Sequence, residues 1–376
     1  MKKSLIAIAA LAAVGAASAQ SSVTLYGLAD VYAGQAKTTK IEYSKRQQGY
    51  VKKVTKTTGF NSGGLQGSRI GVKGVEDLGN GLKAVFNYEM GFNAIDGDLS
   101  ETSGTGVGFG RRAVVGVQGG FGSVLLGRDY TPLFNLLAAS SVDGLSKFET
   151  VGADMYTART NGVHYAGNFS GVGVQAFAGY NKVDRTNTVV STGVKTLDRT
   201  TKYQGYGLGV SYANGPFMVG IAGQEFKNTE SRNLVPSSKG DKRTEAGVGG
   251  SYDFGAAKLF ANYVNTRVRD SVNGASAGKE KAEEFNVGVR VPFGAASVMA
   301  GYGHNRIKTY DSNGDLKAKA KGNDWVVGAN YAFSKRTDVY ARVGRTDDLK
   351  WKNPAGENTG ASSKSENVAV GLRHKF

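Results

Sequence analysis

Seven short turn signals recur along the chain at intervals of 38 to 48 residues, and each is flanked by segments in which apolar and polar residues alternate. The signals are DLGNG at 77, GGFG at 119, GNFSG at 167, ANGP at 213, DFGA at 253, VPFGA at 291 and AFSKR at 332. Alternation of period two is typical of a β-strand whose two faces meet different surroundings. Each turn therefore predicts a hairpin of two strands.

Long polar stretches separate these hairpins, so short and long connections alternate strictly. The stretches centre near 38–66, 93–108, 131–157, 182–202, 228–243, 268–282, 309–322 and 347–363. Seven hairpins give fourteen strands. One further strand precedes the first stretch (VTLYGLADVYAG) and one follows the last (SENVAVGLRHKF), which makes sixteen.

Two architectures have a repeat near this length. A propeller blade would place four strands in each repeat, whereas here each repeat holds two. A transmembrane barrel has an even number of strands, short turns on one rim and long loops on the other. The sequence therefore predicts an all-β fold, a 16-stranded antiparallel transmembrane β-barrel. A large soluble all-β protein is the alternative.

The first residues read as an export signal. Residues 1–19 combine two lysines, an apolar stretch too short to span a membrane, and the small-residue triplet Ala17-Ser18-Ala19. This pattern predicts a cleaved signal peptide, leaving 20–376 as a single barrel domain. An exported chain without cysteine has no disulfides. The net charge of +16 favours anionic partners, but no nucleic-acid-binding motif is present.

Several motifs together resemble the general, non-specific porins of Gram-negative outer membranes, most closely the β-proteobacterial type. They are SSVTLYGLAD, SRIGVKGVEDLGNGLKAVFNYE, FGRRAVVGVQGGFGSVLLGRDYTPL, YTARTNGVHYAG and the ending GLRHKF. The resemblance covers nearly all of 20–376. It implies short periplasmic turns, long extracellular loops, a third long loop folded into the barrel, a homotrimer, and a last strand that is read by the barrel-assembly machinery.

Alternation assigns part of the pore wall. In SRIGVKGVE, Ile70 and Val72 share one face, so Arg69 and Lys73 are expected in the lumen; by the same reasoning Glu89 faces in. Alternation fails at Arg111 and Arg112, because each is in phase with valines. The residues alone leave open which of the two faces the lumen.

The resemblance implies a constriction. It favours Arg111, with Arg69 and Arg159 beside it, and Lys73 and Arg128 complete the expected basic set: Arg69, Lys73, Arg111, Arg128 and Arg159. The expected acids are Glu89, Asp143 and Glu149. The inward loop also contains Lys147, which weakens its acidic side and favours anions.

These residues predict a water-filled diffusion channel for small hydrophilic solutes, with an arginine-lined constriction that prefers anions. The alternative is a substrate-specific anion channel, for example for phosphate, along a path of Lys73, Lys83 and Lys147. Three scattered histidines and the lack of an H-E-x-x-H motif argue against an enzyme. No cofactor or metal is expected. The first long loop has seven basic residues against one acid, which fits contact with lipopolysaccharide phosphates or attraction of anions as well as it fits a soluble loop with incidental charge.

The final strand is expected to pair with the first and close the barrel. Val370, Leu372 and Phe376 share its apolar face, and the resemblance implies that they form the assembly signal. Aromatic residues near strand ends predict girdles at the membrane interfaces; they are Tyr26, Phe121, Phe169, Phe254, Phe293, Phe333 and Phe376.

Overall fold

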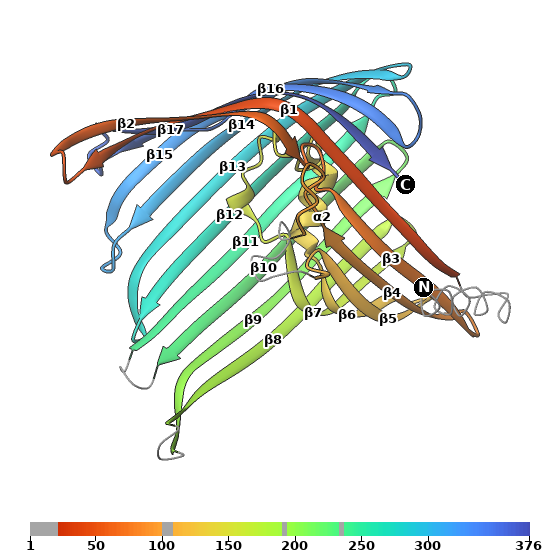
Figure 1. Cartoon of the computed structure of the whole chain (residues 1–376), viewed down its shortest axis with the longest axis horizontal. Helices are drawn as coiled ribbons and strands as arrows, with labels where there is room; N and C mark the ends of the chain where they lie inside the picture. Colours follow the sequence, from red (N-terminus) through yellow and green to blue (C-terminus); the bar gives the residue numbers. More distant parts are fainter. Residues whose placement is uncertain (1–21, 100–107, 190–193, 233–236) are drawn as a thin grey trace.

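The computed structural model describes residues 22–99, 108–189, 194–232 and 237–376, and antiparallel strands make up most of it (Figure 1). The expected signal peptide lies outside these residues. The strands are β1 Ser22–Ser44, β2 Gly49–Ser62, β3 Arg69–Gly79, β4 Leu82–Gly91, β5 Arg112–Gly119, β6 Gly122–Tyr130, β7 Arg159–Phe169, β8 Val172–Val189, β9 Val194–Asn214, β10 Phe217–Arg232, β11 Ser237–Asp253, β12 Lys258–Val272, β13 Ala275–Phe293, β14 Ala296–Tyr310, β15 Leu316–Ala332, β16 Thr337–Lys352 and β17 Asn358–Lys375. The two short helices are α2 Pro132–Ser140 and the 3₁₀ helix η2 Ala153–Met155.

The wall closes on itself. Each strand from β3 to β16 pairs with the next, and β1 pairs with both β3 and β17. The predicted barrel of sixteen antiparallel strands is therefore confirmed. β2 is additional: among the described strands it pairs with β1 alone, from Val31 to Ser44, beyond the stretch of β1 that β3 covers. It lies inside the polar segment that the sequence predicts as the first loop.

The seven predicted short turns are all present as hairpin connections, but the long loops are shorter than predicted. Much of their polar sequence continues the strands, so that β9 has 21 residues and β13 has 19. The prediction of loops over 182–202 and 268–282 is wrong for this reason. Where both faces of a hairpin meet water, the apolar alternation that signals a strand disappears although the backbone pairing continues.

The two faces of the wall differ in the direction expected for a lipid-embedded barrel. Along β12, Asn262, Val264 and Thr266 are buried inside, whereas Leu259 and Tyr263 are exposed outside. The same contrast recurs around the barrel, with polar side chains buried within it and large apolar ones on its outer surface. A soluble protein would present the opposite arrangement.

The aromatic residues near the short turns lie mostly on the outer surface. Phe121, Phe169, Phe254, Phe293, Phe333 and Phe376 are exposed, as a girdle requires. Tyr26 is the exception, because its hydroxyl donates inward to Asn87 at 2.9 Å and to Glu89 at 3.1 Å. Its assignment to a girdle is wrong.

The segment between β6 and β7 folds into the barrel, where Figure 1 shows α2 within the ring of strands. Thr131 caps α2 by accepting a hydrogen bond from the Phe134 amide, and Pro132 occupies the first turn. Leu133 and Leu137 are fully buried against the inner wall. No helix in the described ranges is long and apolar enough to cross a membrane.

Packing inside the barrel occurs in two apolar clusters. One contains Leu133, Leu136, Leu137, Val151, Met155, Ala222, Val264 and Ala282. The other contains Leu65, Val142, Phe148, Met299, Val326, Tyr340 and Ala369 with Phe260. Inner-face glycines permit this close approach: a Cβ at Gly288 would lie 2.5 Å from the Val142 Cβ. The inward segment therefore packs along part of the wall, largely from β9 to β17.

Candidate functional site

Basic side chains at the start of β3, just before β5 and at the start of β7 meet around Glu89 and Tyr130. Arg111 Nε donates to Glu89 at 2.7 Å, and Arg69 Nε lies 3.6 Å from the other carboxylate oxygen. The Tyr130 hydroxyl accepts from Arg111 at 3.2 Å and from Arg159 at 2.7 Å. The Arg159 guanidinium also lies 4.3 Å from the centre of the Tyr130 ring. The structure thus brings together the three arginines that the resemblance selects.

Alternation failed at Arg111 because this residue lies outside the strand. β5 begins at Arg112, which pairs in register with Glu89 and follows the inner face. Arg112 Nη2 donates to Asp129 at 2.7 Å. Arg111 precedes the strand, so the two-residue alternation does not set the direction of its side chain. Its guanidinium contacts Glu89. Both arginines therefore contact groups on the inner side.

Arg128 and Lys73 lie at different places on the wall. Arg128 donates to the Gly110 carbonyl at 2.7 Å and to Asn161 Oδ1 at 3.2 Å. It lines the same cavity as Arg159, although along β6 it is in phase with the exposed Leu126. Lys73 lies 5.4 Å from the centre of the Tyr26 ring. Arg128, like Arg111 and Arg159, is close to a strand end, where the chain leaves the wall.

The expected acids do not share one role. Glu89 is buried inside the arginine cluster. Asp143 is instead held by Arg342 on β16 through two hydrogen bonds of 2.6 and 2.8 Å, with Arg290 at 3.7 Å. Asp143 and Arg342 are both buried. An acid tied in this way anchors the inward loop and presents little negative charge to water.

Glu149 is also buried, within the loop itself. It accepts hydrogen bonds from the Asp143 amide at 2.7 Å and from the Thr150 amide at 3.0 Å. Burial, together with the nearby Asp143 carboxylate, raises the pKa of Glu149. Burial likewise raises the pKa of Tyr156 in the same loop to about 12. The loop acids of the expected constriction therefore contribute less exposed charge than their number suggests.

Further anchors that the sequence analysis did not identify hold the loop to the wall. Glu284 on β13 accepts from the Gly152 amide at 3.1 Å. Glu245 on β11 accepts from the Thr157 amide and hydroxyl, each at 2.8 Å. Asn262 on β12 donates to the Ser140 carbonyl at 3.0 Å. All three wall residues follow the inner-face alternation of their strands, a signal that could have identified them.

A second segment, residues 63–68, also turns inward and supports the loop. Asp30 is fully buried and accepts from the Leu65 and Gln66 amides, each at 2.8 Å, and from the Tyr340 hydroxyl at 2.6 Å. The Lys147 amide in turn donates to the Gly64 carbonyl at 3.0 Å. The Lys147 ammonium donates to a backbone carbonyl of β2 at 2.8 Å, so this lysine also takes part in fixing the loop.

The final strand lies where it was predicted. β17 pairs with β1 from Leu28 opposite Lys375 onward. Val370 and Leu372 are exposed on the outer face. Phe376 exchanges two backbone hydrogen bonds with Gly27, of 3.0 and 3.1 Å. Its ring covers that glycine so closely that a Cβ there would lie 2.2 Å from the Phe376 Cζ.

Comparisons with known proteins agree with this architecture. A family model described as Gram-negative porin matches residues 5–350. The chain is 32% identical to outer membrane porin protein 32 of Delftia acidovorans, with all of both chains covered. Among solved structures, an anion-selective porin from Comamonas acidovorans superposes with a TM-score of 0.63 and 25% identity, over 95% of this chain and 100% of that one.

A more distant solved structure shares the fold. OmpT of Vibrio cholerae in a trimer form superposes with a TM-score of 0.58 at 16% identity, over 95% of this chain and 100% of that one. The family match, the full-length relative and the closed barrel with an apolar outer face all agree. The chain belongs to the Gram-negative porin family and is a β-barrel of the outer membrane.

Proposed function

We propose that this porin is a diffusion channel for small hydrophilic solutes that prefers anions. The observation that carries the proposal is the unequal placement of charge beside the inward loop. Arg69 and Arg111 share the carboxylate of Glu89, and Arg159 joins Arg111 at the Tyr130 hydroxyl, whereas Asp143 is held by Arg342. Fixed positive charge at a narrow aqueous passage concentrates anions and repels cations. The similarity to an anion-selective porin supports the same reading.

Replacing Arg69, Arg111 and Arg159 together with glutamine is expected to lower the anion-to-cation permeability ratio about fivefold or more. The change removes three fixed positive charges and leaves Glu89 unpaired. The measurement is the reversal potential across a planar bilayer in a potassium chloride gradient. Cation preference of the native channel, or an unchanged reversal potential in the triple variant, would contradict the proposal.

A charge-matched control distinguishes local from general effects. Glutamine at Arg267, Arg269 and Lys335 also removes three positive charges, but all three side chains are exposed and lie away from the inward loop. This control is expected to keep the native reversal potential. Saturation of the current by one particular anion in the native channel would favour the substrate-specific alternative over general diffusion.

We also infer that the last residue assists assembly. Deleting Phe376 is expected to lower the yield of folded, inserted protein several-fold, because it removes the ring that covers Gly27 and two closing hydrogen bonds. Comparing insertion in cells with refolding in detergent separates two roles. A loss confined to cells indicates recognition by the assembly machinery. A loss in both indicates barrel closure, and normal insertion in cells would refute the inference.

The export signal, the trimer and contact with lipopolysaccharide are part of the same proposal. The trimer form of a structural neighbour supports a homotrimer. In the β1–β2 hairpin, Lys40 is directly opposite Lys53, and Lys37, which has the Glu366 carboxylate at 3.8 Å, is directly opposite Lys56. Like charges facing each other across strands destabilise a hairpin unless an anion lies between or beside them. Lipopolysaccharide phosphates at the membrane surface have the required charge.

A further inference from the structure

The positive side chains along the inner wall differ in how far they are neutralised. Arg69 and Arg111 share Glu89, Arg112 pairs with Asp129, and Arg243 pairs with Glu245. Arg128 and Arg159 have no carboxylate within ion-pair distance anywhere in the described ranges. The least compensated positive charge of this region therefore lies at Arg128 and Arg159. These residues lie next to the arginines around Glu89, because Arg159 and Arg111 donate to the same Tyr130 hydroxyl.

These two arginines line a cavity of about 230 Å³ that faces the inner surface of β9 to β11. Its other lining residues are Thr157, Thr160, Asn161, Tyr203, Phe226, Asn228, Asp241 and Arg243. Arg243 is fixed there by Glu245 and by the backbone carbonyl of Asp154. Three guanidinium groups from three strands thus border a single small cavity.

The cavity is rich in hydrogen-bond donors. Asn161 Oδ1 accepts from Arg128, so its amide nitrogen can face the cavity. Thr160 and Tyr203 share one hydroxyl hydrogen bond, which leaves the second hydroxyl proton without a partner in the described structure. The Arg159 Nε is buried and also has no partner in that part of the chain. Forked guanidinium donors and hydroxyls match an oxyanion with several acceptor oxygens better than they match a halide.

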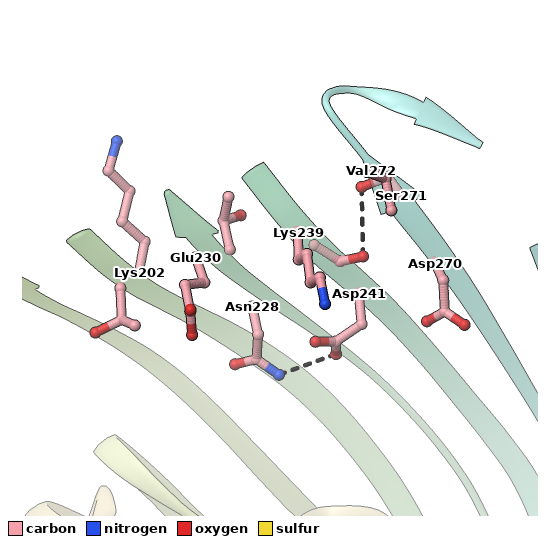
Figure 2. Close-up of a pocket in the computed structure, with 11 residues that line it drawn as sticks. Lys202, Asn228, Glu230, Lys239, Asp241, Asp270, Ser271 and Val272 are labelled. Atoms are coloured by element: carbon pink, nitrogen blue, oxygen red, sulfur yellow. Dashed lines mark hydrogen bonds between the residues drawn. The ribbon is translucent and has the colours of Figure 1, made fainter. Parts of the chain in front are cut away.

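A second hollow adjoins the arginine cavity, and acidic residues as well as lysines line it. It measures about 510 Å³ and shares Asn228 and Asp241 with the arginine cavity. Figure 2 shows Asn228 donating to Asp241, with Lys239 and Asp270 nearby. Lys202 and Lys239 line it together with Glu230, Asp241 and Asp270. Acids therefore accompany the lysines in this second hollow, and Asp241 lies at the boundary between it and the arginine cavity.

We propose that the Arg128–Arg159–Arg243 cavity is a binding station for small oxyanions, such as inorganic phosphate or carboxylates, beside the arginine cluster at Glu89. This inference rests on the proposed anion channel and makes it more specific. Oxyanions bind at Arg128 and Arg159, whereas the arginines around Glu89 mainly favour the passage of anions over cations. Asp241 weakens binding at the station because it places a negative charge at its edge.

Inorganic phosphate is the probe. Chloride current through single native channels is measured while phosphate is added, and the half-blocking concentration is determined. Arg128→Gln and Arg159→Gln are each expected to raise that concentration about tenfold, since each removes a charge-assisted donor. Asp241→Asn is expected to lower it about threefold by removing a repelling charge. Arg111→Gln is expected to raise it clearly less than Arg128→Gln does, because it removes a nearby charge but none of the station's donors, and the exposed control Arg269→Gln is expected to change it less than twofold.

The outcomes separate this station from the channel function. An anion-preferring native channel that phosphate does not block overturns the station and leaves the proposed function intact. Equal effects of Arg128→Gln and Arg111→Gln also overturn it, because they would place binding at the Glu89 cluster. If Arg128→Gln does not insert, Asp241→Asn decides alone: tighter block supports the station, and unchanged or weaker block refutes it.

Discussion

Replacing Arg342 with methionine is expected to destabilise the inward loop by about 3–5 kcal/mol, because it leaves the buried Asp143 carboxylate without its main partner. Arg342 is only 1% exposed and holds both oxygens of Asp143. Arg290 remains at 3.7 Å, too far for the short, paired hydrogen bonds that it would have to replace. The loop should then detach from β16 and fluctuate within the pore.

The double variant Arg342→Met with Asp143→Asn tests the physical reason. It removes both charges, and replacing a buried ion pair with neutral groups is often close to neutral in free energy. Thermal unfolding in detergent at a fixed heating rate, together with open-channel current noise, gives the comparison. Arg342→Met should lower the unfolding midpoint and increase noise, and the double variant should restore much of both. A double variant as unstable as Arg342→Met would show that the ion pair does not anchor the loop.

The barrel itself could be predicted from the sequence because the surroundings of its side chains alternate from one strand residue to the next. Lipid on one side and water on the other impose a two-residue alternation, and short turns require glycine or asparagine at fixed places. Asn80 and Gly81 in the first short turn both have positive φ. These signals give the number of strands and the closing pair of β1 and β17. They do not give strand length beyond the membrane, because there both faces are polar.

The candidate site was harder to predict, because it is built where the alternation ends. Arg111 precedes β5, Arg128 is near the end of β6, and Arg159 begins β7. At such positions the chain leaves the wall, and side-chain direction depends on contacts such as those with Tyr130. The family resemblance selected these residues where periodicity could not.

The loop anchors show a different limit. Arg342 and Tyr340 are in phase with each other, so alternation places both inside. The alternation does not predict that Arg342 binds Asp143, which is 199 residues away in the sequence. A pairing of that kind depends on how the loop packs in three dimensions. Its consequence for function is large, because it decides whether the loop acid faces water or is neutralised at the wall.

Replacing Asp30 with alanine is expected to have the second large effect, a loss of about 3 kcal/mol or more, since hydrogen bonds to a charged group contribute about 1.5–3 kcal/mol each. Asp30 is fully buried and satisfies the Leu65 and Gln66 amides and the Tyr340 hydroxyl. Without it, these donors remain buried and unpaired. The 63–68 segment should then separate from the wall, and its contact with Lys147 should be lost.

Tyr340→Phe is the matched control for this prediction, because it removes one of the three donors and leaves both amide hydrogen bonds to Asp30 in place. Its expected cost is about 1 kcal/mol. The unfolding midpoint in detergent should therefore fall much further for Asp30→Ala than for Tyr340→Phe. Protease cleavage within 63–68 should also increase only in the alanine variant, since only there do the backbone amides lose their acceptor. Equal midpoints for the two variants would show that the Tyr340 hydroxyl, and not the inward-turned backbone, depends on Asp30. Support of the loop by this segment would then have to come from the packing of Leu65 in its apolar cluster.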